Sequence, residues 1–103
     1  MEWVNYHHLL YFWVVAREGG LEPAGAVLKL SHSTLSTQIH ALEAQLGEKL
    51  FSKVGRKLAL TEMGHVVFRY ADEIFTLGRE MVDTVKGSSS GHARRLAVGI
   101  VDV

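Results

Sequence analysis

A hydroxyl-rich stretch followed by a short basic segment holds the side chains of this sequence that are best suited to recognition chemistry. Residues 31–37, SHSTLST, contain three serines and two threonines. A helix needs only one hydroxyl as its N-terminal cap, so the others are available for further hydrogen bonds. Short hydroxyl side chains can donate to and accept from base edges and phosphates. Residues 53–57, KVGRK, add three positive charges of the kind that attract phosphates.

The local charge of the chain favours an anionic partner, although the total charge does not. The 103 residues include 11 Lys and Arg and 11 Asp and Glu, so the formal net charge is zero. Residues 29–60 hold five basic and two acidic residues, whereas residues 61–86 hold three basic and five acidic ones. Because a phosphate backbone responds to nearby charge, residues 29–60 are the candidate binding segment.

Two helices are expected before the hydroxyl-rich stretch. The first covers NYHHLLYFWVVAREGG, is apolar on more than one face and ends at its glycine pair, which predicts burial between two neighbours. Its aromatic density favours packing over base stacking for Trp3, Tyr6, Tyr11, Phe12 and Trp13. Pro23 suits the first turn of the second helix, PAGAVLKL, whose small residues let another helix approach closely.

The third helix, about residues 33–46, is expected to turn one face to the core. Leucine and isoleucine recur on it at spacings of four, three and four, which predicts a buried stripe of Leu35, Ile39, Leu42 and Leu46. Gly47 then ends the helix. The opposite face presents Ser33, Thr34, Thr37 and Gln38. The four-residue turn LSHS joins this helix to the second in a helix-turn-helix pattern.

A hairpin and a long helix are expected to follow. KLFSKVGRKLALT alternates around Gly55, which predicts a two-stranded wing with a basic tip at residues 52–57, and an arginine there suits a narrow minor groove. Thr61 is a plausible cap for a helix to about Lys86, which would be about 39 Å long. That length exceeds the size of the preceding unit, so part of the apolar stripe of this helix extends beyond it. A second copy of the same helix is the simplest way to bury that part. The residues expected to pair the two copies are Val67, Ala71, Ile74, Leu77, Met81 and Val85.

Several classes of function lack a signal in this sequence. The absence of cysteine removes disulfides and thiolate metal sites, and no two histidines are four apart as in a helical metal pair. The longest apolar run, residues 9–16, is too short to span a membrane, and the N-terminus lacks the basic start of a signal peptide. No catalytic motif is present. We therefore expect a cytoplasmic protein that is not an enzyme and has no metal or cofactor.

The motifs of residues 31–64 also resemble the N-terminal DNA-binding domain of LysR-type transcriptional regulators. The matching positions are Ser31, Leu35-Ser36, Gln38-Ile39, Leu42-Glu43, Leu46-Gly47, Leu50-Phe51, Lys53, Arg56, Thr61 and Gly64. The first helix is similar to that family's first helix, and residues 61–86 are similar to its linker helix. NYHHLLYFW and FRYADEIFTLGREM further resemble the family's activators of sodium/proton antiporter genes.

This resemblance implies a mainly α winged helix-turn-helix fold, three helices plus a β-hairpin wing, followed by a long dimerising linker helix. It implies base or phosphate contacts from His32, Ser33, Thr34 and Thr37, phosphate anchoring by Ser31 and Ser36, and wing contacts from Lys53 and Arg56. Three positions depart from the family pattern. His32-Ser33 replaces Gln-Pro, Thr37 replaces an arginine, and Glu22 replaces a small or hydroxyl residue. We expect an altered sequence preference and a weaker affinity for the DNA backbone.

The expected organisation is a DNA-binding domain at residues 1–60, a linker and dimerisation helix at 61–87, and the hinge and first strand of an effector-binding domain at 88–103. The resemblance implies that double-stranded DNA and a second copy are the partners. It also implies that a small effector and tetramer formation depend on a domain that follows. Two alternatives remain: a winged-helix module that binds another protein and not DNA, and a regulatory subunit of an enzyme.

Overall fold

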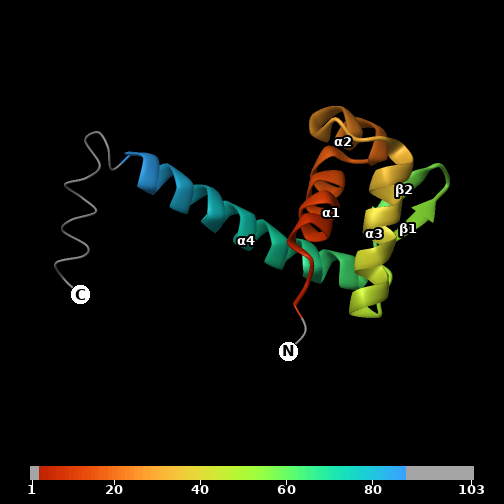
Figure 1. The fold of residues 1–103 in the computed structure, drawn as a ribbon. Helices are drawn as coiled ribbons and strands as arrows, with labels where there is room; N and C mark the ends of the chain where they lie inside the picture. The colour runs from red at the N-terminus through yellow and green to blue at the C-terminus, as the bar shows by residue number, and fades with distance from the viewer. Residues whose placement is uncertain (1–2, 88–103) are drawn as a thin grey trace. The chain divides into compact units, whose positions relative to one another are not determined.

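The computed structural model describes residues 3–87, which form four helices and one two-stranded antiparallel sheet (Figure 1). The elements are α1 (Tyr6–Glu18), α2 (Leu21–Leu28), α3 (His32–Leu46), β1 (Phe51–Val54), β2 (Lys57–Leu60) and α4 (Glu62–Gly87). The mainly α winged helix-turn-helix fold with a long following helix is confirmed. The hinge and strand expected at residues 88–103 lie outside the described residues.

The starts and ends of the helices follow from local side chains and glycines. The side chain of Asn5 accepts hydrogen bonds from the backbone N–H groups of His7 and His8 at 2.9 and 3.2 Å, which caps α1. Ser31 caps α3, because its Oγ accepts from the N–H of Thr34 at 3.1 Å. The helix therefore begins at His32, one residue before the expected start. Gly47, with φ of +74°, ends it as expected.

The core lies between α1, α2 and α3 and extends to the base of the hairpin. Its largest fully buried side chains are Phe12, Val15, Leu35, Leu42 and Leu50. The Phe12 ring lies 5.2 Å from that of Phe51, which connects α1 to β1. A Cβ on Gly25 would lie 2.7 Å from the carbonyl oxygen of Leu30, so glycine here lets the turn after α2 fold closely against this helix.

Two expectations about the core were wrong. Leu46 is 41% exposed, although the three earlier members of its stripe are buried. It is the last residue of α3, where no following turn of the helix shields it. Trp3 and Tyr6 are also exposed, because Trp3 precedes α1 and Tyr6 is its first residue. Among the aromatic residues of α1, Phe12 is the one that enters the core completely.

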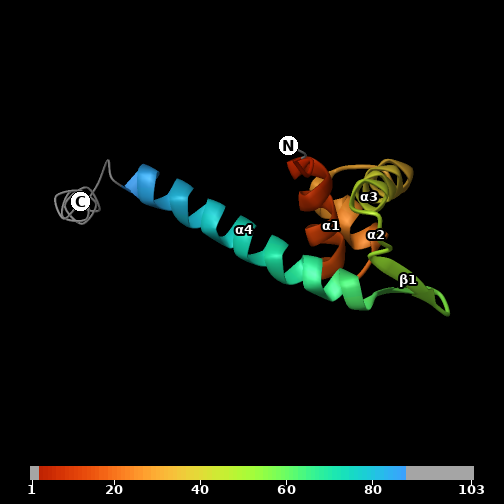
Figure 2. The same cartoon turned by 90° about the horizontal axis from the view of Figure 1, so that it is seen from below.

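The chain divides into two compact units, and the boundary between them lies inside α4, between Asp72 and Glu73. The first unit contains α1, α2, α3, the hairpin and the start of α4, and Figures 1 and 2 both show the hairpin projecting from its three-helix body. Within this unit, the indole N–H of Trp13 donates to a carboxylate oxygen of Asp72 at 3.1 Å, which connects α1 to α4. Within residues 3–87, no helix combines the length and apolar character needed to cross a membrane.

Candidate nucleic-acid interface

A groove of about 550 Å³ lies between α3 and the hairpin in the first unit. Four of the eight residues that the sequence predicted to contact DNA line it together: His32, Ser36, Lys53 and Arg56. The same groove is lined by five charged or titratable residues that were not among those eight: Glu22, His40, Glu43, Lys49 and Lys57. The fold thus brings polar side chains of the hydroxyl-rich helix and cationic side chains of the wing to one groove.

The remaining predicted contacts lie at the start and on the outward face of α3. Ser33 and Thr37 are exposed and four residues apart, so they share one face of the helix. Thr34 is half-buried, and its Oγ1 accepts a hydrogen bond from Ser31 Oγ at 2.8 Å. Ser31 and Thr34 are therefore engaged with each other in the cap. Ser33 Oγ also lies 3.3 Å from Ser31 Oγ and so takes part in the cap, whereas Thr37 lies one turn further along the exposed face.

The wing owes its shape to one glycine. In the antiparallel hairpin Val54 pairs with Lys57, so Gly55 and Arg56 form a two-residue turn. Gly55 has φ of +66°, a conformation in which a side chain is strained, and glycine is preferred at the first position of such a turn. Lys53, Arg56 and Lys57 are all exposed at this end of the hairpin. The turn therefore concentrates three cationic side chains at the tip.

Glu43 joins α3 to the wing, a role that the sequence analysis did not assign. Its side chain is buried, and one carboxylate oxygen accepts hydrogen bonds from the backbone N–H groups of Leu50 and Phe51 at 2.7 and 3.2 Å. The sequence feature that could have indicated this contact is the acidic residue that follows the apolar Leu42 in the L-E-x-x-L-G motif. Because buried carboxylates need hydrogen-bond donors, this position predicts a structural contact.

Replacing Glu43 with alanine is expected to destabilise the domain by about 1–3 kcal/mol, because two backbone N–H groups at the base of the hairpin lose their acceptor. Urea unfolding followed by circular dichroism measures this loss. Glu48→Ala is the matched control, since Glu48 is exposed and its removal should change the free energy of unfolding by less than about 0.5 kcal/mol. Equal stabilities of the two variants would contradict the assigned role.

The T-x-x-G motif holds the start of α4 against the base of the hairpin. Thr61 Oγ1 donates to the carbonyl oxygen of Lys49 at 2.6 Å and accepts from the N–H of Gly64 at 2.9 Å, so Thr61 is the cap that the sequence predicted. A Cβ on Gly64 would collide with the carbonyl oxygen of Leu50. Glycine is therefore required for this close approach of α4 to the chain that leads into β1.

The residues expected to pair two copies differ in exposure. Ala71 is completely buried within its own chain, and Val67 and Ile74 are half-buried. Leu77, Met81 and Val85 are each more than 60% exposed, and Val82 is 41% exposed. Among the six residues expected to pair two copies, the three that are exposed therefore all follow Glu73.

Three helices, a short turn between α2 and α3, and an antiparallel hairpin after α3 define a winged helix-turn-helix protein. Residues 6–65 match the family of bacterial regulatory helix-turn-helix proteins called lysR, and the chain belongs to this family.

Individual relatives agree with this assignment. The transcriptional activator protein NhaR of Escherichia coli (strain K12) is 48% identical over 85 residues, which cover 82% of this chain and 28% of NhaR. The chain thus spans less than a third of the length of that relative. The crystal structure of the BenM DNA-binding domain with catB site 1 DNA is similar with a TM-score of 0.76 and 33% identity, over 85% of this chain and 98% of that one. The CbnR domain in complex with DNA has a TM-score of 0.71 and 30% identity, over 84% and 99%.

Proposed function

We propose that this chain binds double-stranded DNA sequence-specifically, as the N-terminal part of a LysR-type transcriptional regulator. The observation that carries the proposal is the groove in which α3 and the basic wing present His32, Ser36, Lys53 and Arg56 together. An α-helix fits the major groove of B-DNA, and a basic hairpin tip suits the narrower minor groove. The similar BenM and CbnR domains are both complexed with DNA, which supports DNA binding by this chain.

Each predicted contact has a role in this proposal. His32, Ser33, Thr34 and Thr37 contact bases or phosphates at the N-terminal half of α3, and Ser31 and Ser36 anchor phosphates. Lys53 and Arg56 bind from the wing. Thr37 and Ser33 are neutral side chains, so direct reading of bases relies on hydroxyl hydrogen bonds and the wing supplies the salt-sensitive part of the affinity.

Two copies are proposed to pair through the exposed apolar residues of α4. A two-fold dimer places two copies of α3 in major grooves about one helical turn, or a multiple of it, apart, which favours a pseudo-palindromic site. In this proposal residues 1–60 bind DNA, residues 61–87 link and pair the copies, and residues 88–103 begin an effector-binding domain. The similarity to NhaR, a transcriptional activator protein, supports a role in transcription regulation, and in this proposal the protein is cytoplasmic and is not an enzyme.

Selection of bound sequences from a random pool of double-stranded DNA tests the proposed function. The expected result is an enriched motif with two-fold symmetry, because both half-sites contact the same surface of two identical copies. Affinity for that motif should fall steeply between low and physiological salt, because binding releases counterions from the phosphates. Failure to enrich any motif at low salt would favour the protein-binding alternative.

The proposed dimer predicts the effect of charges on α4. Leu77→Glu combined with Met81→Glu should raise the dimer dissociation constant by about 100-fold or more, because two exposed apolar side chains that a partner would bury become charged. Analytical ultracentrifugation measures the change. Glu80→Gln, an exposed substitution on the same helix, is the control and should leave association unchanged. If the double variant associated as strongly as the wild type, the dimer contact would have to lie elsewhere.

A further inference from the structure

The geometry of B-DNA specifies what must occupy the groove between α3 and the hairpin. One sugar-phosphate strand separates each major groove from the neighbouring minor groove. If α3 lies in the major groove and the wing tip in the minor groove, that strand must pass between the two elements. The groove lined by α3 and the hairpin lies at this place.

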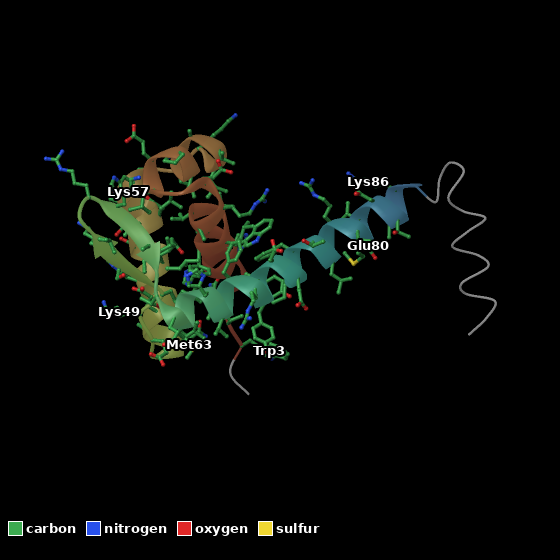
Figure 3. The ribbon with its side chains drawn as sticks, turned by 180° about the vertical axis from the view of Figure 1, so that it is seen from behind. Trp3, Lys49, Lys57, Met63, Glu80 and Lys86 are labelled. Carbon is green, nitrogen blue, oxygen red and sulfur yellow. The ribbon has the colours of Figure 1, made fainter. Side chains whose placement is uncertain are left out.

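His40 and Lys49 line this groove and have no role so far. His32, Ser36 and His40 recur every four residues and all line it, so His40 lies about 12 Å along α3 from His32. Lys49 precedes β1, and it lines both the groove and a second hollow that His40 also lines. Figure 3 places Lys49 near the base of the hairpin and Lys57 towards its tip. His40 and Lys49 therefore lie at the end of the groove that is distant from the wing tip.

We propose that His40 and Lys49 bind backbone phosphates of the DNA strand that runs through this groove, and that His40 does so in its protonated form. The inference rests on the proposed DNA-binding function and assigns two contacts beyond those predicted from the sequence. Histidine is the side chain that ordinarily changes its charge near neutral pH, and a phosphate favours the charged form. DNA affinity should therefore increase as the pH falls.

The other charged groups around His40 are consistent with this assignment. Those facing the two hollows that His40 lines are His32 and Glu43 on α3, Glu48 and Lys49 after it, Lys53, Arg56 and Lys57 on the hairpin, and Glu22 on α2. The carboxylate of Glu43 is already engaged with the backbone N–H groups of Leu50 and Phe51. Glu22 is exposed and lines the groove, so its charge should repel the same strand. The proposal thus predicts opposite effects for neutralising Glu22 and neutralising Lys49.

The test measures binding of a mixed-sequence duplex of about 30 bp by fluorescence anisotropy at low salt. His40→Gln and Lys49→Gln should each weaken binding about two- to fivefold, and Glu22→Gln should strengthen it by a similar factor. Between about pH 8 and pH 6 the affinity of His40→Gln should increase less than that of the wild type. His40→Lys should bind at least as tightly as the wild type and show the same reduced pH dependence as His40→Gln, since His32 remains in both variants.

His7→Gln is the matched control, because His7 is an exposed histidine on α1 that lies beside Tyr11 and does not line the groove. Thermal unfolding of each variant verifies its fold, and the opposite signs expected for Lys49 and Glu22 separate a phosphate contact from a general loss of structure. A wild-type chain that fails to bind any duplex at low salt would overturn the proposed function itself. A wild type that binds DNA while His40→Gln and Lys49→Gln behave identically to it would overturn this inference alone.

Discussion

Replacing both Lys53 and Arg56 with alanine is expected to weaken DNA binding by about 30-fold or more at physiological salt. Both side chains are exposed on the hairpin and line the groove beside α3, where they would contact the phosphate backbone or the minor groove. Removing two such contacts should also reduce the slope of log affinity against log salt concentration by about two. Fluorescence anisotropy with the selected DNA motif, measured over a range of salt, gives both quantities.

The control for this double variant removes the same charge from another part of the molecule. Arg69 and Arg79 are exposed on α4, so Arg69→Ala with Arg79→Ala changes the net charge equally and should reduce DNA affinity much less. Self-association of the Lys53 and Arg56 variant should equal that of the wild type. If both double variants lost the same affinity, the effect would come from total charge and the wing would have no specific role.

Replacing Gly64 with alanine is expected to destabilise the first unit by about 1–3 kcal/mol. The added Cβ would meet the carbonyl oxygen of Leu50, and its next neighbours are the carbonyl carbon of Leu50 at 3.0 Å and Leu60 Cδ2 at 3.1 Å. Because the nearest atom belongs to the backbone at the base of the hairpin, α4 must move away for the side chain to fit. Urea unfolding followed by circular dichroism measures the change in the free energy of unfolding.

Gly78 offers a matched substitution in the same helix. No atom outside its own turn of the helix lies within 4 Å of a Cβ at Gly78. Gly78→Ala should therefore stabilise α4 by up to about 1 kcal/mol through the higher helix propensity of alanine. The same Gly→Ala substitution is therefore expected to lower the free energy of unfolding at Gly64 and to raise it at Gly78. A Gly64→Ala variant as stable as Gly78→Ala would show that the contact with Leu50 relaxes at little cost.

Local features of this chain were predictable because their causes lie within a few residues of each other. The apolar stripe of Leu35, Ile39 and Leu42, the glycine that ends α3 and the cap at Thr61 each depend on backbone positions at most four residues apart. The hairpin likewise follows from alternation around Gly55. The observed start of α3 lies one residue before the predicted start. Ser31 and Ser33 were both suitable caps in the sequence, and only the structure shows that Ser31 is the cap.

By itself, then, the sequence determined the order of the helices and the wing, and the motifs that indicate the family. Only the tertiary structure decided which side chains meet across the groove and that Ala71 is buried while Leu46 is exposed. Only the tertiary structure likewise shows that Gln45 contacts Trp3, because the side-chain amide of Gln45 donates to the carbonyl oxygen of Trp3 at 2.6 Å. The physical reason is that hydrogen bonding within a helix or hairpin depends on neighbours in the chain, whereas burial and contact depend on segments separated by tens of residues.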